Sequence, residues 1–282
     1  PFSAEAAETG HFSDTSGHWA EAQISEAVAK GYVSGYPDGT FRPNGTITRA
    51  EAASMLSRLT QLEAEEGNGQ VFGDLAGHWS REQVEKLVAL GFIDAEDYPE
   101  GFGPDTPVTR FELMKWLATG LAKSDESFAQ ALIDTQDTLL PTPESFKGGI
   151  EPHQVPYIAV VRGTGIIFGF EDMTFRPANH ATRAEVVAIM LRYAGVEGTQ
   201  AEDYRDLNEL REVGTMGTNL TSISNYRYDV TSDNFKIHDF NHVRDKTITS
   251  RYNHFTIQVH RIILVDVTDR KKIGRASCRE RV

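Results

Sequence analysis

The apolar positions of the chain return in the same arrangement three times within its first two hundred residues. In the first copy two short segments place their apolar side chains at the spacing of one helical face, about three to four residues apart. Their apolar positions are Ala20, Ile24, Ala27 and Val28, and then Ala52, Met55, Leu56 and Leu59. The pattern predicts two amphipathic helices, the first beginning near Trp19 and the second at Thr48.

The segment between these two helices carries turn signals. Gly31 is placed as a helix-ending glycine, and Tyr36-Pro37-Asp38-Gly39 is typical of a β-turn with proline in its second position. The second helix opens with Thr48 and Glu51, the spacing of a capping box. The sequence therefore predicts a helix, a structured loop and a second, well-capped helix.

One spacing, F-x-P-x4-T-R-x-E, occurs three times. Its positions are Phe41, Pro43, Thr48, Arg49 and Glu51, then Phe102, Pro104, Thr109, Arg110 and Glu112, then Phe175, Pro177, Thr182, Arg183 and Glu185. A repeat of about 50 residues cannot bury both of its helices alone, so neighbouring repeats must pack on one another. We expect a mainly α fold in which three repeats close into a bundle with pseudo-threefold symmetry and leave grooves between repeats.

The arginine of this spacing is unusual, because it occupies the first position of a helix. A cation is mildly unfavourable beside the positive end of the helix dipole, whereas free backbone N–H groups there bind anions. Arg49, Arg110 and Arg183 are therefore predicted to line anion pockets and to face loop residues of the next repeat. The alternative is an ion pair with a carboxylate of a neighbouring repeat.

These motifs resemble the S-layer homology domain, above all through "GYPDGTFRPNGTITRAE", over about residues 12 to 196. The resemblance implies a three-pronged helical bundle that anchors exported proteins non-covalently to the bacterial cell wall. It implies a secondary cell-wall polysaccharide as partner, with a pyruvylated and hence anionic terminal sugar. It implies no catalysis and no cofactor, and it makes the three arginines the carboxylate contacts.

Further site residues are carried over by their position in the repeat. Trp19 and Trp79 would line the sugar pocket, with core packing as the alternative. Asp14 and Asp74 would bind sugar hydroxyls or pin the loop, with capping of the first helix as the alternative. Gly35 and Tyr36 would let the loop backbone approach the sugar.

The third repeat departs from the pattern at its start. Aligning Gly165 with Gly31 puts His153 where Trp19 stands and Gly148 where Asp14 stands. We therefore expect two competent grooves at most, and the altered loop of repeat two leaves its groove less certain.

The predicted domain boundaries follow from the repeats and from shifts in composition. They are repeat one over 1–66, repeat two over 67–123, repeat three over 124–198, a linker with one short helix over 199–214, an incomplete β-rich domain over 215–271 and a non-native tail over 272–282. The tail resembles a translated sequencing adapter and holds the one cysteine, Cys278. Without it the chain has no thiol for disulfides or catalysis.

The net charge limits the possible partners. The whole chain carries −13; the tail has four Lys or Arg and one Glu, so the remainder carries −16. Such an acidic body argues against nucleic acid and anionic membranes as general partners. No apolar run reaches the roughly 20 residues of a membrane-spanning helix, so membrane insertion is not expected.

The β-rich segment is expected to form four or five strands that open a sandwich-type domain. It holds His238, His242, His254 and His260, but no metal-site spacing, so we predict no metal. Asp229, Asp233, Asp239 and Asp266 form no convincing acid–base pair.

For the chain as a whole, the leading prediction is a non-catalytic, extracellular anchor in the bacterial cell wall or S-layer. The alternatives are the amino-terminal part of an exported enzyme, such as a polysaccharide hydrolase, or of a lattice-forming S-layer protein.

Overall fold

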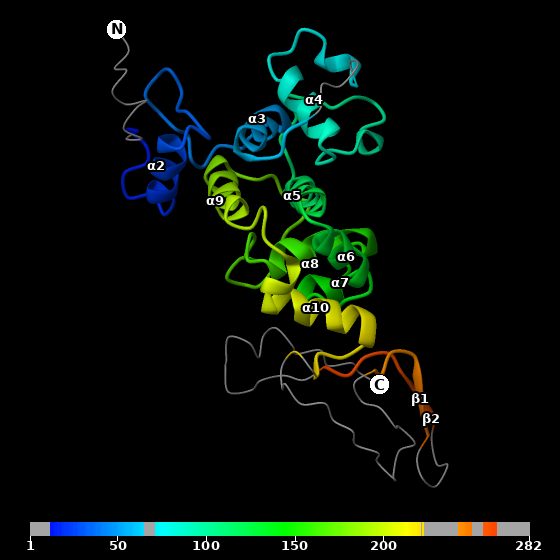
Figure 1. Ribbon diagram of the computed structural model, residues 1–282. Coiled ribbons are helices and arrows are strands. Elements are labelled where there is room, and N and C mark those ends of the chain that lie inside the picture. The colour runs from blue at the N-terminus through cyan, green and yellow to red at the C-terminus, as the bar shows by residue number, and fades with distance from the viewer. Residues whose placement is uncertain (1–11, 65–70, 221, 223–241, 250–255, 264–282) are drawn as a thin grey trace. The chain divides into compact units, whose positions relative to one another are not determined.

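Helices form nearly all of the regular structure in the computed structural model, which describes residues 12–64, 71–220, 222, 242–249 and 256–263 (Figure 1). The described chain divides into two units. The first contains residues up to Asp125 together with Arg176–Thr199, and the second contains Glu126–Phe175 and the residues from Gln200 onward. Within the described residues, no helix combines the length and the apolar character needed to cross a bilayer.

The first unit contains the two helices of repeat one, the two of repeat two and the second helix of repeat three. They are α2 (Glu21–Ala29), α3 (Arg49–Leu59), α4 (Arg81–Ala89), α5 (Arg110–Ser124) and α9 (Arg183–Ala194), with short 3-10 turns η1 (Gly73–Leu75) and η2 (Ala95–Asp97). The predicted first helix begins at Glu21, and Trp19 lies in the turn before it. Gly31 follows its end at φ 73°, and Gly39 N–H donates to the Tyr36 carbonyl, which confirms the predicted turn.

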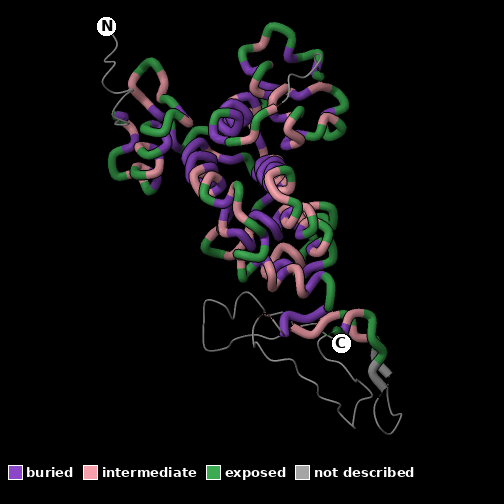
Figure 2. The backbone as a smooth tube through the Cα atoms, viewed as in Figure 1, coloured by how far each residue is buried: buried purple, intermediate pink, exposed green. Residues whose placement is uncertain are grey.

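The three second helices, α3, α5 and α9, are capped as predicted. In each, the threonine hydroxyl accepts from the N3 backbone N–H and the N3 glutamate accepts from the threonine N–H. Each of these helices is buried along most of its length, whereas α2 and α4 each bury one side (Figure 2). In the first unit α4 packs on α3 and α2 packs on α9, so a first helix packs on the second helix of another repeat. This confirms that the repeats bury one another's faces.

A closed ring of backbone hydrogen bonds joins the three repeats. Ile47 N–H donates to the Ala181 carbonyl (3.3 Å), Ala181 to Val108 (3.1 Å) and Val108 back to Ile47 (2.9 Å). All three side chains are buried, and each residue lies two positions before the first arginine of a second helix. The ring gives the pseudo-threefold relation of the repeats directly.

The second unit is built on α6 (Glu126–Asp134), α8 (Val155–Gly163) and α10 (Arg205–Met216), which pack on one another. Shorter elements are α7 (Pro143–Lys147), η3 (Pro152–Gln154) and η4 (Ala201–Asp203). Where we predicted a linker with one short helix, the structure has a twelve-residue helix that buries Leu207, Leu210 and Val213. The packing is close: a Cβ added at Gly163 would lie 2.6 Å from the Leu207 Cα atom.

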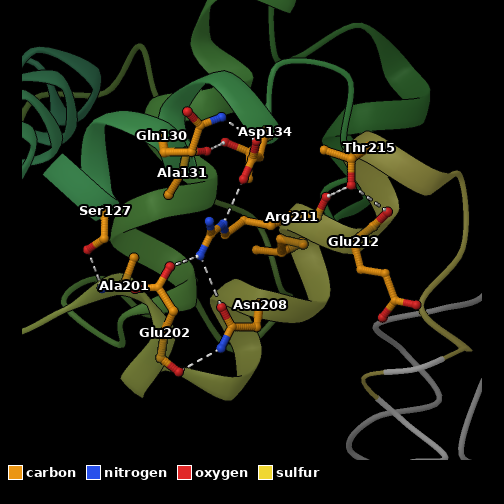
Figure 3. A network of polar contacts seen from close by, with 12 residues as sticks. Ser127, Gln130, Ala131, Asp134, Ala201, Glu202, Asn208, Arg211, Glu212 and Thr215 are labelled. Carbon is orange, nitrogen blue, oxygen red and sulfur yellow. Dashed lines mark hydrogen bonds and ion pairs between the residues drawn. The ribbon is translucent and has the colours of Figure 1, made fainter. Parts of the chain in front are cut away.

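Polar contacts hold α10 against α6 as well. The Arg211 guanidinium donates to Asp134 Oδ2 (2.9 Å) and to Glu202 Oε1 (2.7 Å), and the two carboxylates approach it from different segments (Figure 3). Asn208 also contacts this guanidinium. This segment is therefore an integral part of the second unit.

Two strands follow α10. β1 (Lys246–Thr249) and β2 (Thr256–Val259) pair antiparallel, with Lys246 opposite Val259. The other strands expected over 215–271, and the tail over 272–282, fall largely or wholly on residues outside the described part of the chain. The sandwich-type domain therefore stays a prediction.

Candidate functional site

The start of each second helix has no backbone N–H group left for an anion. In α3, Arg49 N–H donates to the Thr106 carbonyl (2.9 Å) and Ala50 N–H donates to Pro104 (3.0 Å). The next two N–H groups are taken by the hydroxyl and carbonyl of the Thr48 cap. The same four bonds recur at α5 and α9. The premise of open helix N-termini is therefore wrong, because a loop of another repeat supplies carbonyl partners for two of the four groups.

The first-position arginines instead pair with glutamates of neighbouring repeats. The ion pairs are Arg49 with Glu112 (2.7 Å), Arg110 with Glu185 (3.1 Å) and Arg183 with Glu51 (3.6 Å). This is the alternative that the sequence left open. Two of the arginines also face a loop of the paired repeat, as predicted: Arg49 donates to the Phe102 carbonyl and Arg183 to that of Ser34.

Each paired glutamate is the capping-box residue of its own helix. In Glu112 one carboxylate oxygen, Oε2, accepts from Thr109 N–H (2.8 Å), while Oε1 accepts from Arg49. Glu51 and Glu185 divide their two oxygens in the same way. One carboxylate therefore caps a helix and also binds the next repeat.

Two tyrosines complete two of these three contacts. The Arg183 guanidinium lies 4.9 Å from the centroid of the Tyr36 ring, and that of Arg49 lies 5.0 Å from the Tyr98 ring. Each tyrosine hydroxyl donates to the same glutamate that holds the arginine. Burial raises the pKa of both hydroxyls, so they remain protonated donors. Tyr98 was not predicted, although Tyr-Pro-Asp/Glu-Gly is shared by the two loops.

Asp14 and Asp74 pin these loops rather than cap the first helix. The Asp14 carboxylate accepts from Phe41 N–H (2.8 Å) and Arg42 N–H (2.7 Å). Asp74 does the same for the two corresponding residues of repeat two. Neither α2 nor α4 has a side-chain cap. Close packing explains the glycine at position 35, because a Cβ there would lie 2.0 Å from the Phe12 ring.

The two tryptophans lie on the surface. Trp19 and Trp79 are each 58% exposed, so the core-packing alternative is wrong for both. Each ring is tilted 37° from that of the preceding histidine, His18 or His78, at 5.5 and 5.4 Å between centroids. An exposed indole held in the same local geometry in two repeats is a surface on which a sugar ring can stack.

Contacts of the two histidines connect each tryptophan to one arginine helix. His18 Nε2 contacts Asn44 (3.1 Å), and the neighbouring Pro43 and Gly45 carbonyls accept the first two N–H groups of α9. His78 likewise lies 3.7 Å from Asp105, whose neighbours accept the first two N–H groups of α3. We define two junctions by these residues. The Arg183 junction comprises Arg183, Glu51, Tyr36 and Trp19; the Arg49 junction comprises Arg49, Glu112, Tyr98 and Trp79.

Repeat three is less degraded at its start than its sequence indicates. Glu144 Oε2 accepts from Phe175 N–H (2.6 Å), the bond that Asp14 makes to Phe41. The alignment put Gly148 at the position of Asp14, and in the structure Glu144 supplies the carboxylate for this bond instead. The alignment missed it because Glu144 lies four positions before Gly148, within the short helix α7 that precedes that glycine. Repeat three has no tryptophan at this point, and Phe170 replaces the tyrosine.

No group of three or more metal-ligating side chains occurs among the described residues. His242 and His260 lie within the described part, and His260 contacts Asp245. His238 and His254, with Asp229, Asp233, Asp239 and Asp266, fall outside it.

Three helical repeats joined in a ring, two of them with an exposed tryptophan before the first helix, define a repeat-built module. The S-layer homology domain model matches the chain three times, over residues 11–53, 71–114 and 149–187, so the chain contains three S-layer homology domains. Domains of this family anchor proteins to cell-wall polymers and are not themselves catalytic.

The chain is similar to several known proteins. It is 41% identical over 106 residues to Cell surface glycoprotein 1 of Acetivibrio thermocellus, which covers 34% of this chain and 4% of that protein. It is 38% identical over 100 residues to the Cellulosome-anchoring protein of the same organism, covering 34% and 22%. It is 27% identical over 180 residues to Amylopullulanase of Thermoanaerobacterium thermosulfurigenes, covering 64% and 9%. The chain thus spans a small part of each relative.

Proposed function

We propose that this chain holds its protein at the bacterial cell wall by binding a wall polysaccharide with an anionic, pyruvylated terminal sugar at the Arg183 and Arg49 junctions. The observation that carries the proposal is the pair of exposed tryptophans in matching positions. In a domain that anchors to wall polymers, an exposed indole assigned to the same junction as a guanidinium would offer a stacking face and a cation.

The proposed binding uses side chains rather than helix ends. The backbone N–H groups of the arginine helices are already occupied, so the negative charge of the ligand must be met by guanidinium groups. Arg49 and Arg183 keep donors beyond those used by their glutamates, since a guanidinium has five. Repeat three has no tryptophan at the position of Trp19 and Trp79. We therefore propose two binding junctions and leave out the contact that Arg110 makes.

The tryptophans provide the sharper test, because replacing the arginines would also break contacts between repeats. The full chain would be titrated calorimetrically with a wall-polysaccharide fragment ending in a pyruvate ketal. Trp19→Ala, Trp79→Ala and the double variant would be compared with Ile133→Ala, an exposed apolar control on α6. We expect each tryptophan variant to bind about tenfold more weakly, the loss of one stacking contact.

Two results would contradict the proposal. One is a wild-type chain that is folded and binds no wall fragment. The other is a double tryptophan variant that binds as tightly as the Ile133→Ala control.

A second candidate concerns the whole protein. The similarity to Amylopullulanase covers 64% of this chain, which favours an anchor attached to an exported polysaccharide hydrolase; the relatives also leave a lattice-forming S-layer protein as an alternative. Assaying the complete natural protein for starch-degrading activity would separate an enzyme from a purely structural protein.

A further inference from the structure

A histidine ring closes the turn that carries each surface tryptophan. Ala20 N–H donates to His18 Nδ1 (3.1 Å), and Ser80 N–H donates to His78 Nδ1 (3.2 Å). Each bond spans the tryptophan, which is the residue between donor and acceptor. Because a backbone N–H can only donate, Nδ1 must be the ring nitrogen without a proton, and Nε2 carries the proton of the neutral ring. Both repeats therefore require the same tautomer.

The histidine ties the tryptophan to a fixed part of the fold. Ala20 and Ser80, the residues directly before α2 and α4, are fully buried. The bond to Nδ1 joins the imidazole to that buried residue, and the indole lies beside the same imidazole. Since the indole itself is mostly exposed, the histidine is well placed to set its orientation.

The surroundings of the two histidines differ in a way that matters for charge. His18 Nε2 contacts the neutral side chain of Asn44 (3.1 Å), while its Nδ1 accepts the backbone N–H described above. His78 Nδ1 also lies 2.8 Å from the Ser80 hydroxyl, and its Nε2 lies 3.7 Å from the Asp105 carboxylate. A hydroxyl can accept as well as donate, whereas a backbone N–H cannot. Repeat two therefore offers an acceptor to each ring nitrogen, and repeat one offers a donor to Nδ1.

Protonation affects the two sites differently, because both nitrogens of an imidazolium donate. At His18 the new Nδ1–H would face the Ala20 N–H across 3.1 Å, so the hydrogen bond that closes the turn is lost. At His78 the new Nδ1–H can donate to the Ser80 hydroxyl, and the charged ring faces Asp105. Acid should therefore open the turn in repeat one and leave it closed in repeat two.

The other charged groups close to these histidines in the sequence are already engaged. Asp14 and Asp74 accept N–H groups of their own loops, and Glu21 accepts a backbone N–H of the turn before it (2.9 Å). In repeat two, Arg81 pairs with Glu85 (2.9 Å). Within the described part of the chain, the one ion pair made by either imidazole is therefore the contact in repeat two.

We propose that His18 and His78 are positioning residues for the tryptophans that follow them in the sequence. Protonation releases Trp19 in repeat one but leaves Trp79 in place in repeat two. This inference rests on the proposed function, and it makes the repeat-one site the acid-sensitive one. Binding at Trp19 is complete where His18 is neutral, and it weakens as the pH falls through the range in which histidine gains its proton, from about pH 8 to about pH 5.

The indole N–H resonances of the full chain test the positioning without any ligand. Trp116, the third tryptophan, is buried and donates to the Tyr98 hydroxyl (3.1 Å), so its resonance is an internal reference. Between about pH 8 and about pH 5 we expect the Trp19 resonance to shift, that of Trp79 to shift less and that of Trp116 to stay in place. His18→Asn is the matched variant, because an asparagine oxygen can accept the same N–H and does not titrate. It should abolish the Trp19 shift.

Calorimetric titration then measures what the released tryptophan contributes to binding. Trp79→Ala leaves the repeat-one site and Trp19→Ala leaves the repeat-two site. Each would be titrated with the wall fragment that ends in a pyruvate ketal, at about pH 8 and about pH 5. At the lower pH we expect Trp79→Ala to bind about tenfold more weakly, the loss of one stacking contact, and Trp19→Ala to change by less than about twofold. Adding His18→Asn to Trp79→Ala should abolish the weakening.

The failures of this inference and of the proposed function are distinguishable. Equal shifts of the Trp19 and Trp79 resonances would overturn the inference, as would a Trp79→Ala chain that binds equally well at both pH values. Weakening that persists after His18→Asn would overturn it too, because another group would then carry the pH dependence. A folded wild-type chain that binds no fragment at either pH would overturn the proposed function, while the resonances would still decide the positioning role.

Discussion

At the residue scale, two contacts explain why each repeat carries a glutamate three positions after the capping threonine. The residues are Glu51, Glu112 and Glu185. A glutamine could cap the helix, but it could not neutralise the arginine of the next repeat. Each glutamate does both, with one oxygen for each partner. Each T-R-x-E motif thus supplies an arginine that pairs with one neighbouring repeat and a glutamate that pairs with the other.

Glu112→Gln separates these two roles. The amide oxygen can still cap α5, but Arg49 loses its counter-charge at a site where both side chains are largely buried. We expect the free energy of unfolding to fall by about 3 kcal/mol, the usual cost of leaving one member of a buried ion pair without its partner. Urea denaturation would measure it, with the exposed Glu100→Gln as control. A loss no greater than that of the control would show that the glutamate acts only as a cap.

The residue scale also shows where sequence reasoning reached its limit. Thr48, Arg49 and Glu51 predict their own helix end correctly, because capping is decided within four residues. The partner of Arg49 lies 63 residues away, and the carbonyls that occupy the helix N–H groups lie in another repeat. Such contacts depend on how the repeats pack, so the motif left two interpretations of the arginine open.

At the scale of elements, α10 was the helix that its sequence described least well. Its many charged residues are typical of a linker, yet Leu207, Leu210 and Val213 form a buried face at helical spacing. Charges that look solvated in the sequence are paired in the structure, as Arg211 is with Asp134 and Glu202. The prediction of a linker with one short helix underestimated α10, because composition counts charges without their partners.

Gly214→Ala tests how closely α10 is packed. A Cβ at this position would lie 2.0 Å from the Asp134 carbonyl oxygen, so the helix must move away from the end of α6. We expect a loss of about 3 kcal/mol in the free energy of unfolding of the second unit. Limited proteolysis and urea denaturation would detect it. Gly73→Ala is the control, since nothing lies within 4 Å of a Cβ there; equal behaviour of the two variants would contradict the described packing.

At the scale of the whole molecule, the ring through Ile47, Val108 and Ala181 makes the three repeats interdependent. No one of these bonds lies within a single repeat, so none can form until two repeats have met. The first unit should therefore lose all three bonds in one cooperative event.

Hydrogen exchange can test this interdependence. Leu56→Ala removes a fully buried side chain from α3 in repeat one, at a cost of about 3 kcal/mol. We expect the protection of the Ile47, Val108 and Ala181 amides to fall by the same amount, although Val108 and Ala181 belong to other repeats. Loss of protection at Ile47 alone would show that the repeats open independently.

The closed ring also restricts how such a gene can change its length. An open solenoid grows by copying one repeat, because every new copy docks on a free end. A ring of three hydrogen bonds has no free end, and a fourth copy of the segment around Ile47 would find both of its partners already taken. We therefore expect duplication of a single repeat to yield a segment with no partner in the ring, whereas a duplicated set of three repeats could close a second ring.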